Sequence, residues 1–227
     1  MPADAALGGT LAAGLSGPGR FRFGGQRDFI LGVRFVDGTG RLLRLGGKVV
    51  KNAAGFDIPK FLVGSLGRFG VFGEITFKVF PRPASTLTLR LPVTDATAAT
   101  TLLTTAASAR WEIDALDLLP TADAVALRLA GPASALQILA AEILARFPGE
   151  ILSASAADAL WSDLRELRWT HADGPLLKLA LTPAQLPALV ARVLWSERRD
   201  LFGHTLVTLG EAIGGYALAN LLALLRR

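Results

Sequence analysis

The sequence predicts an α+β protein with two domains, residues 1–83 and 84–227. In the first part, glycine recurs at every third position from Gly64 to Gly73, which is incompatible with a helix and leads directly into a strand. The second part alternates predicted strands and helices in the order β-α-β-β-α, which is typical of a ferredoxin-like layer. Pro81-Arg82-Pro83 separates the two parts, because proline donates no hydrogen bond to a sheet.

The first domain is expected to contain a hairpin, a short helix and a further strand. Phe29–Val36 and Arg41–Leu45 are the hairpin strands, and Asp37–Gly40 between them has the residues that tight turns favour. A short helix is predicted at Asp57–Val63, with Asp57 as its N-cap rather than as a catalytic acid. Val71–Phe80 is rich in β-branched and aromatic residues, which predicts a central strand beside Phe29–Val36 with amides well protected from hydrogen exchange.

The second domain is expected to be built from amphipathic strands and helices that share one core. In the first strand, leucine alternates with polar residues, so one face is apolar. The elements are, in order, a strand at Thr86–Val93, a helix from Thr94 or Asp95 to Arg110, strands at Ile113–Leu119 and Ala124–Ala130, helices at Ser134–Phe147 and Ala156–Arg168, a strand at Leu176–Leu181, and a helix starting at Thr182-Pro183.

Composition excludes several classes of function. The net charge is +5, but the basic residues are scattered and no nucleic-acid recognition module is present, so no nucleic-acid partner is expected. The absence of cysteine excludes disulfides and iron–sulfur ligation by these residues. His171 and His204 do not have a metal-ligand spacing, so no metal site is expected. No signal peptide and no transmembrane segment is recognised, which predicts a cytoplasmic protein, associated with the inner membrane only through partners.

Three segments of small residues stand out in the first domain: Leu7–Gly19, Gly46–Asp57 and Gly64–Thr76. Backbone without side chains can adopt positive φ angles and can touch a flat or phosphorylated ligand directly. The alternative is that such backbone makes tight turns or packs against other backbone. Lys48, Lys51 and Asn52 in the middle segment either meet a phosphate or an acidic substrate, or belong to a solvated loop held by Asn52.

Taken together and in this order, the segments resemble the FAD-binding domain of the vanillyl-alcohol-oxidase/PCMH superfamily. Within it, the closest resemblance is to the FAD-binding E subunits of bacterial glycolate oxidases. The motifs that carry it are Gly8 to Pro18, Arg27 to Gly32, Gly46 to Asp57, and Gly64 to Glu74. The implied fold is the second half of a PCMH-type FAD-binding domain followed by a ferredoxin-like α+β cap domain.

The resemblance also implies the cofactor, its contacts and the partners. Gly8, Gly9 and Thr10 are expected to approach the flavin and pyrophosphate, and the adjoining contacts are expected at Gly14, Leu15, Ser16 and Gly17. The adenosine end is expected to be lined by main-chain groups of Gly70, Val71, Glu74 and Ile75. The substrate is a small 2-hydroxy acid, and the partners are a second flavoprotein subunit and an iron–sulfur subunit. No catalytic residue is identified.

The sequence departs from the family pattern in two ways. Members of the family carry a further subdomain before the Gly-Gly motif and an ending that is not found here, so the resemblance implies a truncated chain with part of the FAD cradle. Arg68-Phe69 brings bulk and charge to a place where small residues are usual. Two main hypotheses remain open: an FAD-binding subunit of a glycolate-oxidising complex, or a truncated, non-catalytic interaction subunit that does not hold FAD. A third alternative is a free-standing α+β module that binds a small ligand.

Overall fold

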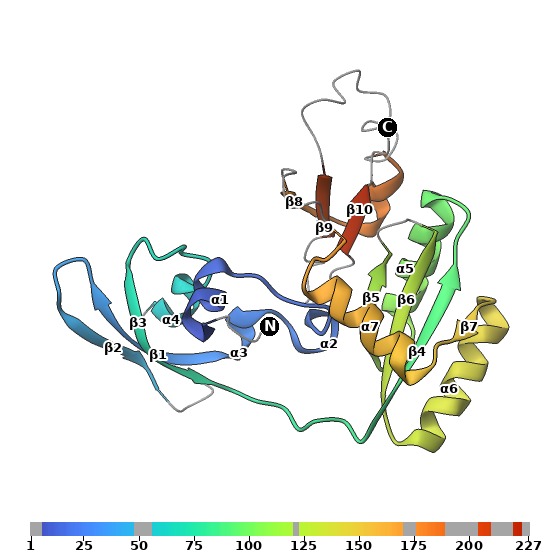
Figure 1. Ribbon diagram of the computed structural model, residues 1–227, viewed down its shortest axis with the longest axis horizontal. Coiled ribbons are helices and arrows are strands. Elements are labelled where there is room, and N and C mark those ends of the chain that lie inside the picture. Colours follow the sequence, from blue (N-terminus) through green and yellow to red (C-terminus); the bar gives the residue numbers. More distant parts are fainter. Residues whose placement is uncertain are drawn as a thin grey trace. The chain divides into compact units, whose positions relative to one another are not determined.

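The structure, a computed structural model, describes residues 6–47, 56–119, 123–169, 176–188, 204–209 and 220–223. The chain folds into two compact units (Figure 1). The first is formed by Met1–Gly17 with Phe23–Arg82, and the second by Pro18–Arg22 with Pro83–Arg227. The mixture of helices and antiparallel strands confirms the α+β class.

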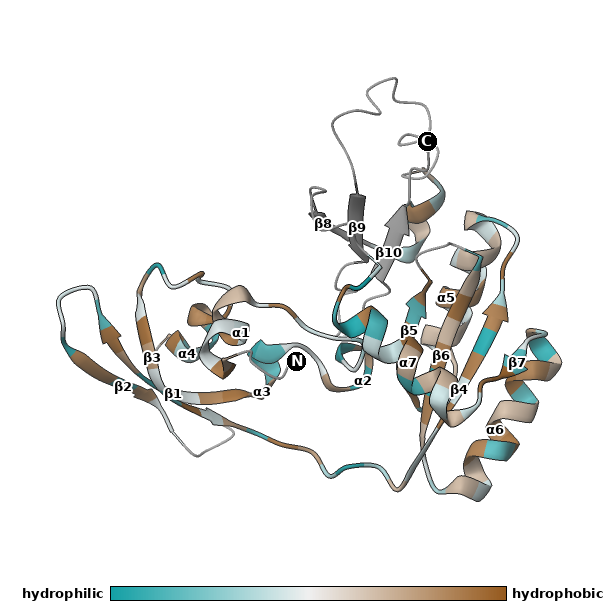
Figure 2. Ribbon diagram, viewed as in Figure 1, coloured by the Kyte–Doolittle hydropathy of each residue, from teal (hydrophilic) through white to brown (hydrophobic). Residues whose placement is uncertain are grey.

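The first unit is a three-stranded antiparallel sheet in the order β2-β1-β3, with α1 and α4 packed on one face. Its strands are β1 (Ile30–Asp37), β2 (Leu42–Gly46) and β3 (Gly70–Phe77), and its helices are α1 (Leu7–Ala13), α3 (Gln26–Phe29) and α4 (Ile58–Leu62). Hydrophobic residues predominate along the strands (Figure 2). The core brings Leu11 of α1 and Leu62 of α4 onto Val33 and Phe35 of β1, so the helices bury the apolar face of the sheet.

Two sequence-based predictions about the third strand need correction. The strand does pair with β1, as expected, but it is not central: β1 lies between β2 and β3, and β3 has no second strand partner among the described residues. The strand also ends at Phe77 instead of Phe80. Phe80 leaves the sheet because its ring packs on Phe23 and Phe29, with centroid separations of 4.9 and 5.6 Å. Hydrogen-exchange protection in this unit should therefore be greatest in β1.

The predicted hairpin is confirmed, and Asp37 organises its turn. One carboxylate oxygen accepts hydrogen bonds from the Thr39 hydroxyl at 2.7 Å and from the backbone N–H groups of Thr39 and Arg41 at 2.9 and 3.0 Å. The other accepts from Arg41 Nε at 3.0 Å. These bonds, led by that of the Thr39 hydroxyl, hold the pKa of Asp37 well below its usual range.

This lowered pKa predicts an acid-sensitive hairpin. The stabilisation is present above the pKa of an unfolded Asp, about 4, and is lost as pH falls through that value toward the folded pKa. Urea unfolding across this range should show a steeper loss of stability for the wild type than for Asp37→Asn, which starts lower at neutral pH. Thr39→Val should lie between the two, and parallel acid profiles for all three proteins would contradict the assignment.

The second unit contains the predicted ferredoxin-like layer. Its strands are β4 (Ser85–Pro92), β5 (Ile113–Leu118), β6 (Ala124–Gly131) and β7 (Glu150–Ile151), and its helices are α5 (Ala96–Ser108), α6 (Ala133–Arg146) and α7 (Ala154–Arg165). The order β5-β6-β4-β7 with antiparallel pairing throughout is that of the βαββαβ topology. Residues of α5 and α6 bury one face of the sheet, and Trp161 and Leu164 of α7 cover the other.

Three further strands, β8 (Leu176–Leu181), β9 (His204–Leu209) and β10 (Asn220–Ala223), form a second sheet in the order β10-β9-β8. The 3-10 helix η1 (Pro183–Gln185) follows β8 and begins with a capping box formed by Thr182 and Gln185. The sequence predicted β8 and the start at Thr182-Pro183, but not β9 or β10. The short helix α2 (Arg20–Phe23) carries Phe21, which packs against the core of the second unit.

Candidate functional site

The first small-residue segment forms helix α1 and the turn that ends it. Gly14 caps the helix with a φ of +65°, a conformation that favours glycine, and its N–H bonds to the carbonyls of Leu11 and Thr10. A Cβ at Gly14 would lie only 2.9 Å from the Cα of Gly64. Glycine is therefore required twice here, for the backbone conformation and for the close approach of another chain segment.

That approaching segment is the third glycine-rich stretch. The N–H of Gly64 donates to the carbonyl of Leu11 at 3.0 Å, and the N–H of Leu66 donates to that of Ala12 at 2.9 Å. Both carbonyls belong to the last turn of α1, and that of Leu11 also accepts the N–H of Gly14 at 3.1 Å. The structure thus joins two of the three segments, about fifty positions apart in the sequence, through their main chains.

Part of this joint is backbone that faces open space. A Cβ at Gly9 or at Gly67 would meet nothing within 4 Å. Gly8 differs, because a Cβ there would contact Phe72 of β3 at 3.5 Å. The Thr10 hydroxyl bonds to the carbonyl of Ala6 at 3.2 Å and so serves the helix. At Gly9 on α1 and at Gly67 in the Gly64–Gly70 loop the main chain therefore lies open, which fits a flat cofactor such as the FAD expected from the resemblance.

The segment after Gly14 is held by a residue that the sequence reasoning missed. The side-chain amide of Gln26, in α3, donates from Nε2 to the carbonyl of Leu15 at 2.7 Å. Leu15 is itself exposed. Nothing in the sequence distinguishes Gln26, because a glutamine that follows two glycines has no characteristic role. Ser16 and Gly17 continue this segment to the boundary with the second unit.

The four residues expected at the adenosine end serve the sheet to different degrees. Glu74 forms an ion pair with Arg34 of β1 at 3.1 Å, and Ile75 packs on the core of the unit. A Cβ at Gly70 would lie 2.1 Å from the carbonyl oxygen of Val36, so this glycine is required by the pairing with β1. Val71 is 74% exposed and the Glu74 side chain 52% exposed, so these are the two members of the group whose side chains are open to a ligand.

The middle segment is described only at its ends. Gly46 and Gly47 close β2, where Gly47 N–H donates to the carbonyl of Leu31 at 3.1 Å. Lys48, Lys51 and Asn52 lie outside the described residues, so both readings of these side chains remain hypotheses. Asp57 is confirmed as the N-cap of α4: its carboxylate accepts the N–H of Lys60 at 3.3 Å.

The second unit holds a buried polar group between its sheet and α7. Arg128 Nε donates to Asp114 at 2.6 Å, and the guanidinium lies 4.8 Å from the ring centroid of Trp161. The indole N–H of Trp161 in turn donates to the Thr88 hydroxyl at 2.9 Å. Each of these groups is paired within the set, so the arrangement reads as a structural network that orients α7 on the sheet.

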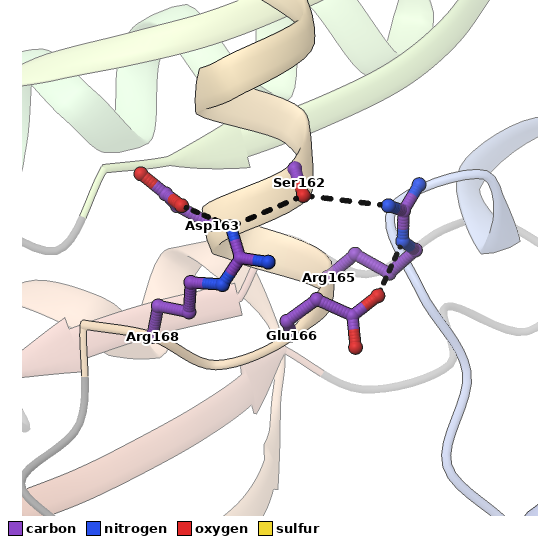
Figure 3. A network of polar contacts seen from close by, with 5 residues as sticks. All are labelled: Ser162, Asp163, Arg165, Glu166 and Arg168. Carbon is purple, nitrogen blue, oxygen red and sulfur yellow. Dashed lines mark hydrogen bonds and ion pairs between the residues drawn. The ribbon is translucent and has the colours of Figure 1, made fainter. Parts of the chain in front are cut away.

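A second polar network lies at the end of α7, as Figure 3 shows. Arg165 pairs with Glu166 at 2.8 Å and Arg168 with Asp163 at 3.1 Å, and both guanidinium groups reach the Ser162 hydroxyl. The backbone N–H of Arg168 also donates to the backbone carbonyl of Asp163, and the preceding residue, Leu167, has a positive φ. This network closes the helix end, where cations are favourable.

The described residues contain neither a cluster of metal ligands nor a membrane-spanning helix. No three His, Cys, Asp or Glu side chains in them gather closely enough to hold a metal ion. His171 lies outside the described residues, and His204 begins β9. None of the described helices has the length and apolar composition needed to cross a membrane.

Comparison with known proteins places these features in context. The chain is 34% identical over 215 residues to glycolate oxidase subunit GlcE of Escherichia coli (strain K12), covering 92% of this chain and 54% of that protein. It is 34% identical over 91 residues to a D-2-hydroxyglutarate dehydrogenase of Xanthomonas citri pv. viticola, covering 39% of this chain and 19% of the dehydrogenase. No protein-family model matches the chain.

A solved structure of alkyldihydroxyacetonephosphate synthase superposes with a TM-score of 0.55 at 19% identity, over 71% of this chain and 36% of the synthase. This likeness concerns the fold. The chain thus spans about half the length of GlcE and a smaller share of the other two proteins. The resemblance read from the glycine motifs is confirmed by the match along nearly the whole chain.

Proposed function

We propose that this chain, a relative of the E subunit of bacterial glycolate oxidase, binds FAD in its first unit and takes part in the oxidation of a small 2-hydroxy acid. The observation that carries the proposal is the joint between α1 and the Gly64–Gly70 loop. It brings two glycine-rich segments together through main-chain hydrogen bonds and leaves Gly9 and Gly67 open. Such backbone suits a large, flat, phosphorylated cofactor.

The residues have distinct parts in this proposal. Gly8, Gly9 and Thr10 approach the flavin and pyrophosphate, Gly14 to Gly17 form the adjoining contact, and Gly70 to Ile75 lie at the adenosine end. Gly14 and Gly70 act by permitting close backbone packing. Gln26 fixes the Leu15 carbonyl and so positions the second of these contacts. When bound, FAD supplies the acceptor for the hydride of the substrate.

The names of the relatives support a proposal for the substrate class and for the partner. Glycolate and D-2-hydroxyglutarate both carry a hydroxyl next to a carboxylate, so a small 2-hydroxy acid is the proposed substrate class. Glycolate as the substrate and glyoxylate as the product are the more specific form of the proposal. The name of GlcE describes a subunit, which supports work in an assembly. The 227 residues contain no cysteine, so we propose that electrons pass to a partner's iron–sulfur cluster.

One observation favours the second hypothesis, an interaction subunit without FAD. Leu42, Val36 and Val71 lie in register across β2, β1 and β3, and all three side chains are exposed, by 58%, 39% and 74%. An apolar row of this kind on a sheet face commonly marks a surface that another protein covers. Both functions can coexist in one subunit, so flavin binding is the property that separates the hypotheses.

The test is an equilibrium titration of the 227-residue chain with FAD, followed by flavin fluorescence. Gly9→Leu should abolish or strongly weaken binding, by about tenfold or more, because a side chain would occupy the open space beside α1. The melting temperature should be unchanged or higher, since leucine favours a helix. Gly38→Leu is the matched control, because a Cβ at Gly38 also meets nothing within 4 Å and the residue lies in the turn between β1 and β2, outside α1.

Wild-type protein that shows no saturable FAD binding would contradict the proposal and favour the interaction subunit. Binding that is equally strong in wild type, Gly9→Leu and Gly38→Leu would show that the cofactor is held elsewhere. We expect the complex to be weak enough to dissociate during desalting, because about half of the length of the GlcE relative lies outside the match.

A further inference from the structure

Two phenylalanines of the first unit form a ring pair at the surface. Phe61, from α4, and Phe69, from the Gly64–Gly70 loop, have ring centroids 4.9 Å apart and planes inclined by 45°. The side chains are 57% and 47% exposed. Neither belongs to the buried core beneath them, which is completed by Leu62 and its neighbours. The pair therefore contributes little to the packing of the unit, and its exposure calls for another explanation.

The loop that presents Phe69 has an unusual backbone. Leu66 has a φ of +53° and Gly67 a φ of +73°, so two consecutive residues are in the left-handed region. For leucine this conformation is strained, and the side chain, 67% exposed, gains little from burial in return. Before this bend, the N–H of Leu66 bonds to α1; after it, the ring of Phe69 packs against that of Phe61.

We propose that Phe61 and Phe69 form a stacking platform for the adenine ring of FAD, an inference that rests on the proposed function. Phe69 immediately precedes Gly70, the first residue proposed at the adenosine end, so the platform is continuous with that contact. Adenine is planar and stacks on aromatic rings without needing a particular hydrogen-bond pattern. Arg68, which is exposed and precedes Phe69 in the sequence, supplies a cation to this loop, which suits the diphosphate of the cofactor.

This proposal also explains the departure from the family pattern at Arg68-Phe69. The structure shows that the bulky ring does not obstruct the open backbone at Gly67, because it turns onto Phe61. Bulk and charge at these positions then become part of the ligand contact. Aromatic side chains in place of small or aliphatic ones would favour a ligand that carries an adenine over one that does not.

FAD and FMN provide the test, because FMN has the same isoalloxazine but lacks the adenine. The double variant Phe61→Ala/Phe69→Ala should weaken FAD binding by about tenfold or more and leave FMN binding unchanged. The variant Phe61→Tyr/Phe69→Trp should bind FAD in preference to FMN as the wild type does, because both positions keep an aromatic ring. The matched control is Val79→Ala/Ile138→Ala, which removes two exposed apolar side chains outside the proposed contacts and should alter neither affinity.

The outcomes separate this inference from the proposed function. Suppose that the wild type binds FAD, and that the double variant either loses FAD and FMN affinity equally or keeps both affinities. The proposed platform is then wrong, and the proposed function stands. Loss of self-association in sedimentation with unchanged flavin affinities would assign the ring pair to a protein contact and also overturn it. If the wild type binds no FAD, both proposals fail. Melting curves of all variants establish that the first unit remains folded.

Discussion

Replacing Gly70 by alanine is expected to destabilise the first unit by about 3 kcal/mol or more. A Cβ at this position would lie 2.1 Å from the carbonyl oxygen of Val36 and 2.9 Å from the ring of Phe35, and the φ of +148° is unfavourable for any side chain. The neighbouring atoms are main chain and core, so they cannot move aside cheaply. Relief would require β3 to separate from β1, the strand that pairs on both of its sides.

Urea unfolding measured on the isolated chain checks this expectation. Gly73→Ala is the control on the same strand, because its Cβ would meet the nearest atom, the carbonyl oxygen of Arg34, at an ordinary 3.7 Å. That variant should unfold within about 0.5 kcal/mol of the wild type. Gly70→Ala should also lose FAD affinity, since the loop before β3 depends on where the strand begins. Equal midpoints for the two variants would show that β3 does not start as described.

The second large effect is expected from Asp114→Ala in the second unit. Arg128 is 24% exposed, and Asp114, only 5% exposed, is the carboxylate that balances its charge. Removing the carboxylate leaves a mostly buried guanidinium between the sheet and α7, which should cost roughly 2–4 kcal/mol. Trp161 stacks on this guanidinium, so its fluorescence reports the loss directly.

Two further variants show whether the cost arises from the stranded charge. Asp123→Ala removes a carboxylate that pairs with Arg90 at 2.9 Å but is 52% exposed, and should cost less than about 1 kcal/mol. Asp114→Leu/Arg128→Met replaces both charges by apolar groups and should recover most of the stability lost in Asp114→Ala. If the double variant is as unstable as the single one, the network contributes through its hydrogen bonds to the sheet and not through charge balance.

Sequence patterns predicted those parts of the fold that depend on local chemistry. The hairpin around Asp37, the cap at Asp57 and the alternation of strands and helices after Pro83 all follow from residues close together in the chain, and the structure confirms them. The prediction that β3 is a central strand was wrong. β-propensity describes how well a residue fits a pleated strand, and it does not state how many neighbouring strands there are. The strands β9 and β10 depend on distant pairing in the same way.

The candidate site was predictable only where glycine carries it. A missing side chain is visible in the sequence, so the segments around Gly14 and Gly64 could be named, but their direct main-chain contact could not. Gln26 acts on the carbonyl of Leu15, eleven positions away, through a geometry that has no sequence signature. Three residues in the loop between Phe61 and Phe69 have positive φ angles, and one of them is a leucine, so the pairing of the two rings has no simple sequence signature.

The assignment of Pro18–Arg22 to the second unit limits how this protein can be divided or recombined. Phe21 packs on the core of that unit, and the guanidinium of Arg22 reaches the carbonyl and the carboxylate of Glu112 at 3.2 and 3.5 Å. A gene fragment that starts at Pro83 would omit both side chains and leave apolar surface uncovered. A recombined gene that exchanges this unit therefore has to include the codons for Pro18–Arg22, or supply other residues that cover the same surface.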